Sequence, residues 1–354
     1  MKQSSQRKRR RTSPAWFLVI GVLLAILLAL IAWAVLQEPT CSGGVCPEPD
    51  TTPPPPSSQV IATEPVQTQP TTLPPTTPPP TQPVSQPMRV VTQTSILSEP
   101  RQDAASIRAL SIGDTVEVIG LEDSWYQLSP AGYLPEHTLR SPGEYLIVID
   151  PGHQGKGNSE KEPIGPGASE KKAKVSSGTQ GVATGIPEYK LTLEVSLKLR
   201  DALEAKGYQV IMTRTEHDVN ISNAQRAQIA NELYADVFIR VHANGDANSN
   251  TKGIMTLCQT PENPYNAHLY DLSCQLSTLV LDEMVAATGG KRQFVWETDT
   301  MSGINWCQVP VTIVEMGYMS NPEEDRLMAS EPYQQKLITG MVGGIEAYLQ
   351  ELAG

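Results

Sequence analysis

The sequence predicts an α/β fold, with a mostly parallel sheet flanked by helices, preceded by a small all-β domain. Two observations favour the α/β part. Apolar, strand-like runs alternate with helical patterns over residues 144–354, and several of these strands end directly before polar residues. A third observation favours the β part, because short strands separated by turn residues fill residues 88–141.

The chain begins with a basic tail and an apolar segment. Residues 1–14 contain six Lys and Arg and no acid, and residues 15–36 carry no charge. A membrane-spanning helix needs about 20 apolar residues, and a positive flank stays on the cytoplasmic side. We therefore expect a cytoplasmic tail at 1–14, a single transmembrane helix at 15–36 and an extracytoplasmic remainder. The alternative is a cleaved signal, for which Ala32-Trp33-Ala34 offers a small-residue site.

Residues 37–87 predict a disordered linker. Fifteen of the 41 residues at 47–87 are Pro, and most of the others are Thr, Gln or Ser. Such a composition does not bury a core and favours extended polyproline II. The linker is either a stalk that holds the later domains away from the membrane or a tether without a length requirement.

Residues 88–141 predict a small barrel. The stretch GDTVEVIGLEDSWYQLSPAGYLPEHTL (113–139) has a Gly-Asp turn, a strand, an acidic turn and a Trp-Tyr strand. This order resembles the bacterial SH3-like wall domains, although their usual Asn-x-Arg-x-Gly-Pro entry is here SILSEP (95–100). The resemblance implies binding to the cell wall, and the alternative is a spacer or a regulatory lid.

The elements of residues 144–354 follow from hydrophobic periodicity and capping. Leu191, Val195, Leu199 and Leu203 form the apolar stripe of one helix, and Ser222 with Gln225 three residues later predicts the N-terminus of another. The expected strands are 145–150, 209–214, 236–244, 253–259 and 309–317, and the expected helices are 189–206, 222–234, 266–287 and 332–352.

Three of these strands run into polar residues. His153 follows the first strand, His242 and Asn244 end the strand at 236–244, and Glu315 lies near the end of the strand at 309–317. Ligands of open α/β sheets gather at the carboxyl ends of the strands, so these side chains are expected to meet. Glu188 opens a helix, where a carboxylate either joins the site or only complements the helix dipole.

Two histidines and two glutamates fit a zinc hydrolase. Catalytic zinc takes three protein ligands and a water, and two His with one Glu is a known ligand set. A second carboxylate then serves as general base and acid. On the residues alone, Glu188 and Glu315 are interchangeable in these two roles. A non-haem iron enzyme with two His and one carboxylate is a rival that leaves the second glutamate without a role.

The charge of the chain excludes a nucleic-acid partner. The sequence has 27 Lys and Arg against 38 Asp and Glu, and without the six cations of the tail the balance is 21 against 38. Nucleic-acid binding requires a basic face, which this acidic exterior does not provide.

Five ordered motifs resemble the zinc-dependent N-acetylmuramoyl-L-alanine amidases of the cell-wall amidase 3 family. They are IDPGH (149–153), Glu188 at its helix start, TR (213–214), FIRVHAN (238–244) and VEMGYMSN (314–321). The resemblance covers residues 145–352 and implies hydrolysis of the amide between N-acetylmuramic acid and L-alanine in peptidoglycan, on the cell-wall side of the membrane. It also implies that His153, Glu188 and His242 bind Zn²⁺ and that Glu315 is the general base and acid.

Some residues depart from the family pattern. Arg240 stands where Ser is usual and contacts either the substrate or a structural acid, and with Asn244 it is a candidate for substrate binding. The 34 residues between His153 and Glu188 are either a flap over the cleft or a mobile surface loop. The rival function is a catalytically retired wall-binding scaffold, which predicts the loss of a metal ligand, and none is lost. Nothing in the sequence identifies a regulatory protein partner.

Overall fold

The structure is a computed structural model that describes residues 85–353. The expected cytoplasmic tail, transmembrane helix and nearly all of the expected linker lie outside these residues. Within the described part, none of the helices combines the length and the apolar character that crossing a membrane requires.

The first described part is an antiparallel seven-stranded sheet with the strand order β3-β2-β6-β5-β4-β1-β7. Its interior is a small apolar cluster that includes Val90, Leu110 and Leu134. The elements are β1 (Gln86–Val90), β2 (Thr94–Leu97), β3 (Ser106–Leu110), β4 (Thr115–Glu122), β5 (Trp125–Ser129), β6 (Tyr133–Pro135), the 3-10 helix η1 (Glu136–Thr138) and β7 (Leu139–Arg140). The sheet begins at Gln86, two residues before the expected start of the domain.

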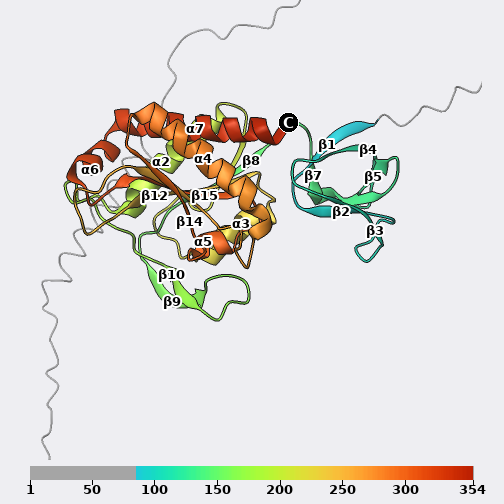
Figure 1. The fold of residues 1–354 in the computed structure, drawn as a ribbon, viewed down its shortest axis with the longest axis horizontal. Helices are drawn as coiled ribbons and strands as arrows, with labels where there is room; N and C mark the ends of the chain where they lie inside the picture. The colour runs from blue at the N-terminus through green and yellow to red at the C-terminus, as the bar shows by residue number, and fades with distance from the viewer. Residues whose placement is uncertain (1–84, 354) are drawn as a thin grey trace, which may run out of the picture. The chain divides into compact units, whose positions relative to one another are not determined.

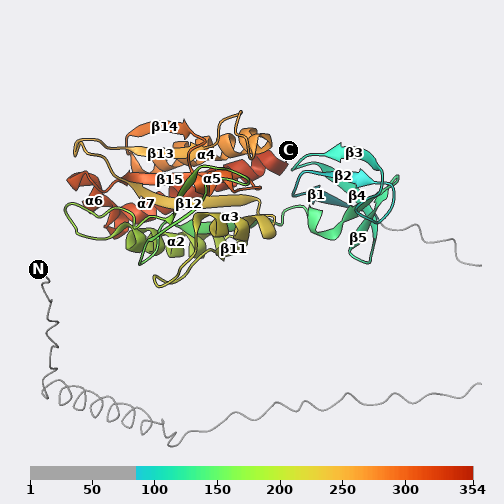
Figure 2. The same ribbon diagram turned by 90° about the horizontal axis from the view of Figure 1, so that it is seen from below.

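The second part is an α/β domain around a six-stranded sheet with the order β11-β8-β12-β15-β13-β14 (Figure 2). Strands β11, β8, β12 and β15 are parallel, and β13 and β14 run in the opposite direction. The strands are β8 (Leu146–Pro151), β11 (Gln209–Met212), β12 (Val237–Asn244), β13 (Ile254–Cys258), β14 (Arg292–Glu297) and β15 (Val311–Tyr318). The carboxyl ends of β8, β12 and β15 therefore lie side by side.

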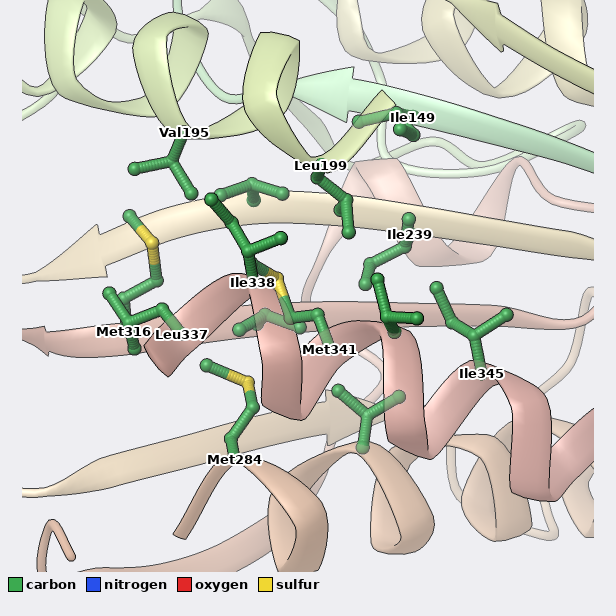
Figure 3. Close-up of a cluster of buried hydrophobic side chains, with 14 of the residues drawn as sticks. Ile149, Val195, Leu199, Ile239, Met284, Met316, Leu337, Ile338, Met341 and Ile345 are labelled. Carbon is green, nitrogen blue, oxygen red and sulfur yellow. The ribbon is translucent and has the colours of Figure 1, made fainter. Parts of the chain in front are cut away.

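Helices cover both faces of this sheet (Figure 1). The helical segments are α2 (Glu188–Glu204), α3 (Asn223–Glu232), η2 (Ala267–Leu269), α4 (Tyr270–Thr288), α5 (Ser302–Asn305), α6 (Pro322–Met328) and α7 (Glu331–Ala353). Helices α2, α4 and α7 bury the larger apolar core against one face, part of which is drawn in Figure 3. Helices α3 and α5 cover the other face with a smaller cluster around Phe238 and Ile313. Strand alternation places Asp150, Arg240, His242 and Glu315 on this second face.

The long segment between His153 and Glu188 forms a β-hairpin that projects from the domain (Figure 1). Its strands are β9 (Asn158–Pro163) and β10 (Lys171–Val175), paired antiparallel. Polar and small residues dominate this segment, so its sequence shows no apolar alternation from which the strands are predictable.

The expected strands and helices of the α/β domain are confirmed, with ends that shift by a few residues. Ser222 caps α3 and forms the expected capping box with Gln225. Strand β14, the hairpin strands and the short helices α5 and α6 were not predicted from the sequence. The antiparallel pairing of β13 with β15 was not predicted either, because periodicity identifies a strand without giving its direction.

Candidate metal centre

Three side chains from three elements converge at the ends of the parallel strands. His153 follows β8, Glu188 is the first residue of α2, and His242 lies near the end of β12. One potential ligand atom from each lies within 4.8 Å of the other two. His153 Nε2 and His242 Nδ1 lie 3.0 and 3.2 Å from Glu188 Oε1 and 3.2 Å from each other. Three atoms with lone pairs thus face one point.

Glu188 is held by the backbone as well as by the histidines. Its carboxylate accepts hydrogen bonds from the backbone N–H of Ala243 (3.1 Å) and of Thr179 (2.8 Å). Burial by itself raises the pKa of Glu188, but the hydrogen bonds and charges of His153 and His242 outweigh this effect and hold the pKa well below its ordinary value. The carboxylate is therefore ionised at neutral pH.

The backbone of Gly152 passes very close to His242. A Cβ atom at this position would lie 2.5 Å from His242 Cε1 and 2.7 Å from the carbonyl oxygen of Val241. Only glycine fits here. Burial is the main cause that lowers the pKa of His242 to about 4, and the charges of His153 and Arg240 lower it further. Glu188 raises this pKa, but by less. The imidazole is neutral at neutral pH, which is the form that binds a metal.

His153 has a left-handed backbone conformation, with φ of 61°. Its Nδ1 lies 3.1 Å from the carbonyl oxygen of Ser176, at the end of the hairpin. A hydrogen bond from Nδ1 to that oxygen leaves Nε2 free to face Glu188.

Two buried arginines fix the turn that carries His153. Arg226 donates to the carbonyl oxygens of Pro151 (3.0 Å) and His153 (2.9 Å). Arg214 donates to those of Pro151 (3.0 Å) and Gly152 (3.0 Å). The sequence analysis named Thr213-Arg214 only as a motif and missed Arg226, because a single arginine on a helix carries no signal of its role.

Asp150 joins these arginines to the strand that carries His242. Its buried carboxylate accepts from Arg226 Nη1 (2.6 Å), Arg240 Nε (2.8 Å) and the Thr213 hydroxyl. Burial raises the pKa of Asp150, but the charges of Arg226 and Arg240 dominate and hold the pKa well below its ordinary value. Arg240 thus bonds a structural acid, one of its two expected roles, and it also lines the cleft described below.

Glu315 lies beside His242 in the register between β12 and β15. Its Oε2 atom is buried and has no hydrogen-bond partner within residues 85–353. Burial, and then the charge of Glu188, raise the pKa of Glu315 well above its ordinary value. The two glutamates that the residue pattern left interchangeable therefore differ in their surroundings. Glu188 lies within hydrogen-bond distance of both histidines, whereas among residues 85–353 no hydrogen bond or ion pair joins Glu315 to them.

These side chains open onto one cleft of about 850 Å³. His153, Glu188, His242 and Glu315 line it, together with the candidate substrate-binding residues Arg240 and Asn244. The hairpin forms another part of the lining, which includes Lys161, Lys171 and Lys172, residues that the sequence analysis did not single out.

The comparisons with known proteins concern the α/β domain that carries this site. Residues 147–347 match the family model described as N-acetylmuramoyl-L-alanine amidase. The N-acetylmuramoyl-L-alanine amidase Rv3717 of Mycobacterium tuberculosis is 30% identical over 213 residues, which are 58% of this chain and 86% of that protein. The amidase AmiC of Neisseria meningitidis is 27% identical over 263 residues, which are 62% of this chain and 58% of that protein.

A solved structure of similar fold supports the same assignment. The N-acetylmuramyl-L-alanine amidase Ami1 from Mycobacterium smegmatis superposes with a TM-score of 0.54 and 28% identity, over 60% of this chain and 100% of that chain. With its family match, its relatives and its α/β domain, this chain belongs to the N-acetylmuramoyl-L-alanine amidase family and hydrolyses peptidoglycan.

Proposed function

We propose that the chain is a zinc-dependent amidase in which His153, Glu188 and His242 bind Zn²⁺ and Glu315 is the general base and acid. The observation that carries this proposal is the convergence of three ligand atoms within 4.8 Å in the cleft that Glu315 also lines. Two imidazoles and one carboxylate form a donor set that catalytic zinc uses.

The chemistry of the site fits a divalent cation. Ligand atoms of two imidazoles and one carboxylate lie close together, an arrangement that a bound cation stabilises. The buried Oε2 atom of Glu315 has no hydrogen-bond partner in the part of the chain that the structure describes, which suits a group that binds a reacting water. The close approach of Gly152 and the arginines on the turn hold the histidines in place.

The proposed mechanism assigns the proton transfers to Glu315. Zinc, when bound, lowers the pKa of a water from about 15.7 to about 7 and polarises the amide carbonyl. Glu315 accepts the proton of the attacking water and returns it to the nitrogen of the departing L-alanine. A pKa raised by burial suits a residue that must both take and give a proton near neutral pH.

The test uses the full-length chain. The metal is removed with a chelator, the protein is reloaded with Zn²⁺ or Fe²⁺, and new L-alanine amino termini are counted in the soluble peptides released from peptidoglycan. We expect Zn²⁺ to restore cleavage in the native chain and not in Glu315→Gln. Restoration by Fe²⁺ alone would favour the iron rival, and zinc binding without cleavage would favour the retired scaffold.

We also propose that the catalytic domain works outside the cell membrane, anchored by residues 15–36 and placed by the linker and an SH3-like domain at 88–141. The uncharged segment behind a basic tail and the location of peptidoglycan outside the membrane support this arrangement. Deletion of residues 1–36 is expected to move the protein from the membrane fraction to the soluble fraction. An unchanged distribution would contradict the anchor.

A further inference from the structure

The hairpin places an unusual charge beside the catalytic cleft. Residues 154–187 contain five lysines against three glutamates, in a chain whose net charge is −11. Three of these lysines, Lys161, Lys171 and Lys172, line the cleft that also holds the metal centre. These lysines therefore place positive charge on the wall of the cleft that the substrate enters.

The hairpin is attached to the body of the domain at several points. Glu162 accepts from the backbone N–H of Ala224 at the start of α3 (3.2 Å), and the Trp306 indole donates to the carbonyl oxygen of Pro163 (2.9 Å). Lys172 Nζ donates to the carbonyl oxygen of Thr300 (2.6 Å), across the cleft-lining segment before α5. These contacts join the hairpin to the body of the domain, where it forms one wall of the cleft.

The two faces of the hairpin carry different charge patterns. In the cross-strand register, Lys161 faces Ala173 and Lys171 faces Pro163, so this face has lysines without an acid opposite them. The acids at 160 and 162 lie on the alternate face, where Glu160 pairs with Lys174 at 2.7 Å. Within the described residues, neither Lys161 nor Lys171 forms an ion pair.

The floor of the cleft adds to this positive charge. Arg240 lines it, and the buried Asp150 carboxylate compensates only one of the two arginines bonded to it. The acids in the lining are Glu188 and Glu315 at the metal centre, and Asp246 beyond the end of β12. The hairpin side of the cleft is therefore cationic, while the acids lie at the metal centre and on the β12 side.

We propose that Lys161 and Lys171 form a subsite for a free carboxylate of the stem peptide, and that this subsite makes the enzyme prefer acidic stems over amidated ones. The inference rests on the proposed function, because it assumes that the peptide beyond L-alanine leaves the metal centre along this wall. Ammonium groups recognise carboxylates through charge-assisted hydrogen bonds, and a carboxamide offers only a neutral acceptor.

The test compares two substrates that differ in one group. Each is N-acetylmuramic acid linked through its lactyl carboxyl to L-alanyl-D-glutamate, with the γ-carboxyl of the glutamate blocked as a methylamide in both substrates and the α-carboxyl either free or amidated. The full-length, zinc-loaded native chain is compared with the double variant Lys161→Gln/Lys171→Gln. Lys174→Gln is the matched control, since Lys174 lies on the same hairpin outside the cleft lining and pairs with Glu160.

We expect the double variant to lose about tenfold in kcat/KM on the acidic substrate, mainly through KM, because the lost contact is made equally in the ground and transition states. The activity of the double variant on the amidated substrate should equal that of the native chain. The activity of the control Lys174→Gln should equal that of the native chain on both substrates. Equal losses on both substrates, or no loss on either, would overturn the subsite.

If the native chain cleaves neither substrate, the proposed function fails. Titration calorimetry of the two corresponding free peptides, with the γ-carboxyl of the glutamate blocked as a methylamide and the α-carboxyl either free or amidated, then tests the subsite separately. Tighter binding of the acidic peptide to the native chain than to the double variant supports the subsite, and equal binding overturns it.

Discussion

Glu315 combines a functional position with an unfavourable environment. In the metal-free protein its carboxylate is desolvated and one oxygen has no hydrogen-bond partner among residues 85–353, so ionisation opposes folding. Because its pKa in the folded state exceeds the ordinary value of 4.5, the unfolded chain loses this proton first and stability falls as the pH rises above about 4.5. The buried carboxylate of Glu315 therefore lowers the stability of the folded protein at the position where a reactive group is needed.

Glu315→Gln removes this penalty. We expect the variant to raise the free energy of unfolding of the metal-free protein by about 1–3 kcal/mol at pH 7, and to equal the native protein below about pH 4. Urea denaturation at both pH values in the presence of a chelator measures the difference. A variant that is less stable than the native chain at pH 7 would contradict the assignment of a desolvated carboxylate.

In contrast to Glu315, the ionised carboxylate of Asp150 stabilises the folded protein, because Arg226 and Arg240 compensate its charge. Asp150→Asn leaves the buried guanidinium groups of Arg226 and Arg240 without their acid, and we expect a loss of about 3–5 kcal/mol in the free energy of unfolding. The pKa of Asp150 is lowered in the folded state, so its contribution is present above its ordinary pKa of 3.8 and fades as the pH falls further.

The measurement is urea denaturation of Asp150→Asn and of the control Glu160→Gln, in which the substituted side chain is exposed and pairs with the half-buried Lys174. The control should leave the unfolding midpoint unchanged. A loss of less than 1 kcal/mol for Asp150→Asn would show that the network does not hold the turn in place.

At the scale of elements, the contact between α4 and α7 depends on two glycines. A Cβ at Gly340 would lie 2.4 Å from Met284 Cα, and one at Gly344 would lie 2.4 Å from Val280 Cα. Both neighbours are backbone atoms of α4, so they cannot move aside without separating the helices. Gly343 differs, since its added Cβ would meet only the side chain of Glu283, at 3.2 Å.

Gly344→Ala should therefore lower the free energy of unfolding by about 1–3 kcal/mol through overpacking. Gly343→Ala should leave stability unchanged or raise it by up to about 1 kcal/mol, because alanine favours the helix. Chemical denaturation of the two variants measures both values. Equal effects of the two substitutions would show that helix propensity, and not the close packing of α7 on α4, decides the outcome.

The elements also show what the sequence allowed us to predict. Strand ends at His153, His242 and Glu315 were predictable, since parallel strands with helical connections bring their carboxyl ends to one edge. The hairpin was not, because Lys161 and its neighbours lack apolar alternation. Strand β14 was missed because its most exposed large residues, Phe294 and Trp296, are apolar and obscure the pattern of a sheet edge.

At the scale of the whole molecule, contacts between residues far apart in the sequence hold the candidate ligands in place. The sequence placed the candidate ligands, but the bonds from Arg226 and Arg214 to the turn at 151–153 span more than 60 residues along the chain. Such contacts leave no periodic signal. The same applies to the bond from Arg240 to Asp150. Arg240 also lines the cleft, and its contact with the substrate stays a prediction.

The most direct test of the account is the amount of zinc bound per chain after dialysis, measured by elemental analysis for the native protein, Glu188→Gln and Glu315→Gln. The account predicts one zinc per chain in the native protein and in Glu315→Gln, and a large loss in Glu188→Gln, because Glu188 alone supplies the carboxylate ligand. Retention of zinc in Glu188→Gln together with its loss in Glu315→Gln would exchange the roles of the two glutamates and contradict the proposed centre.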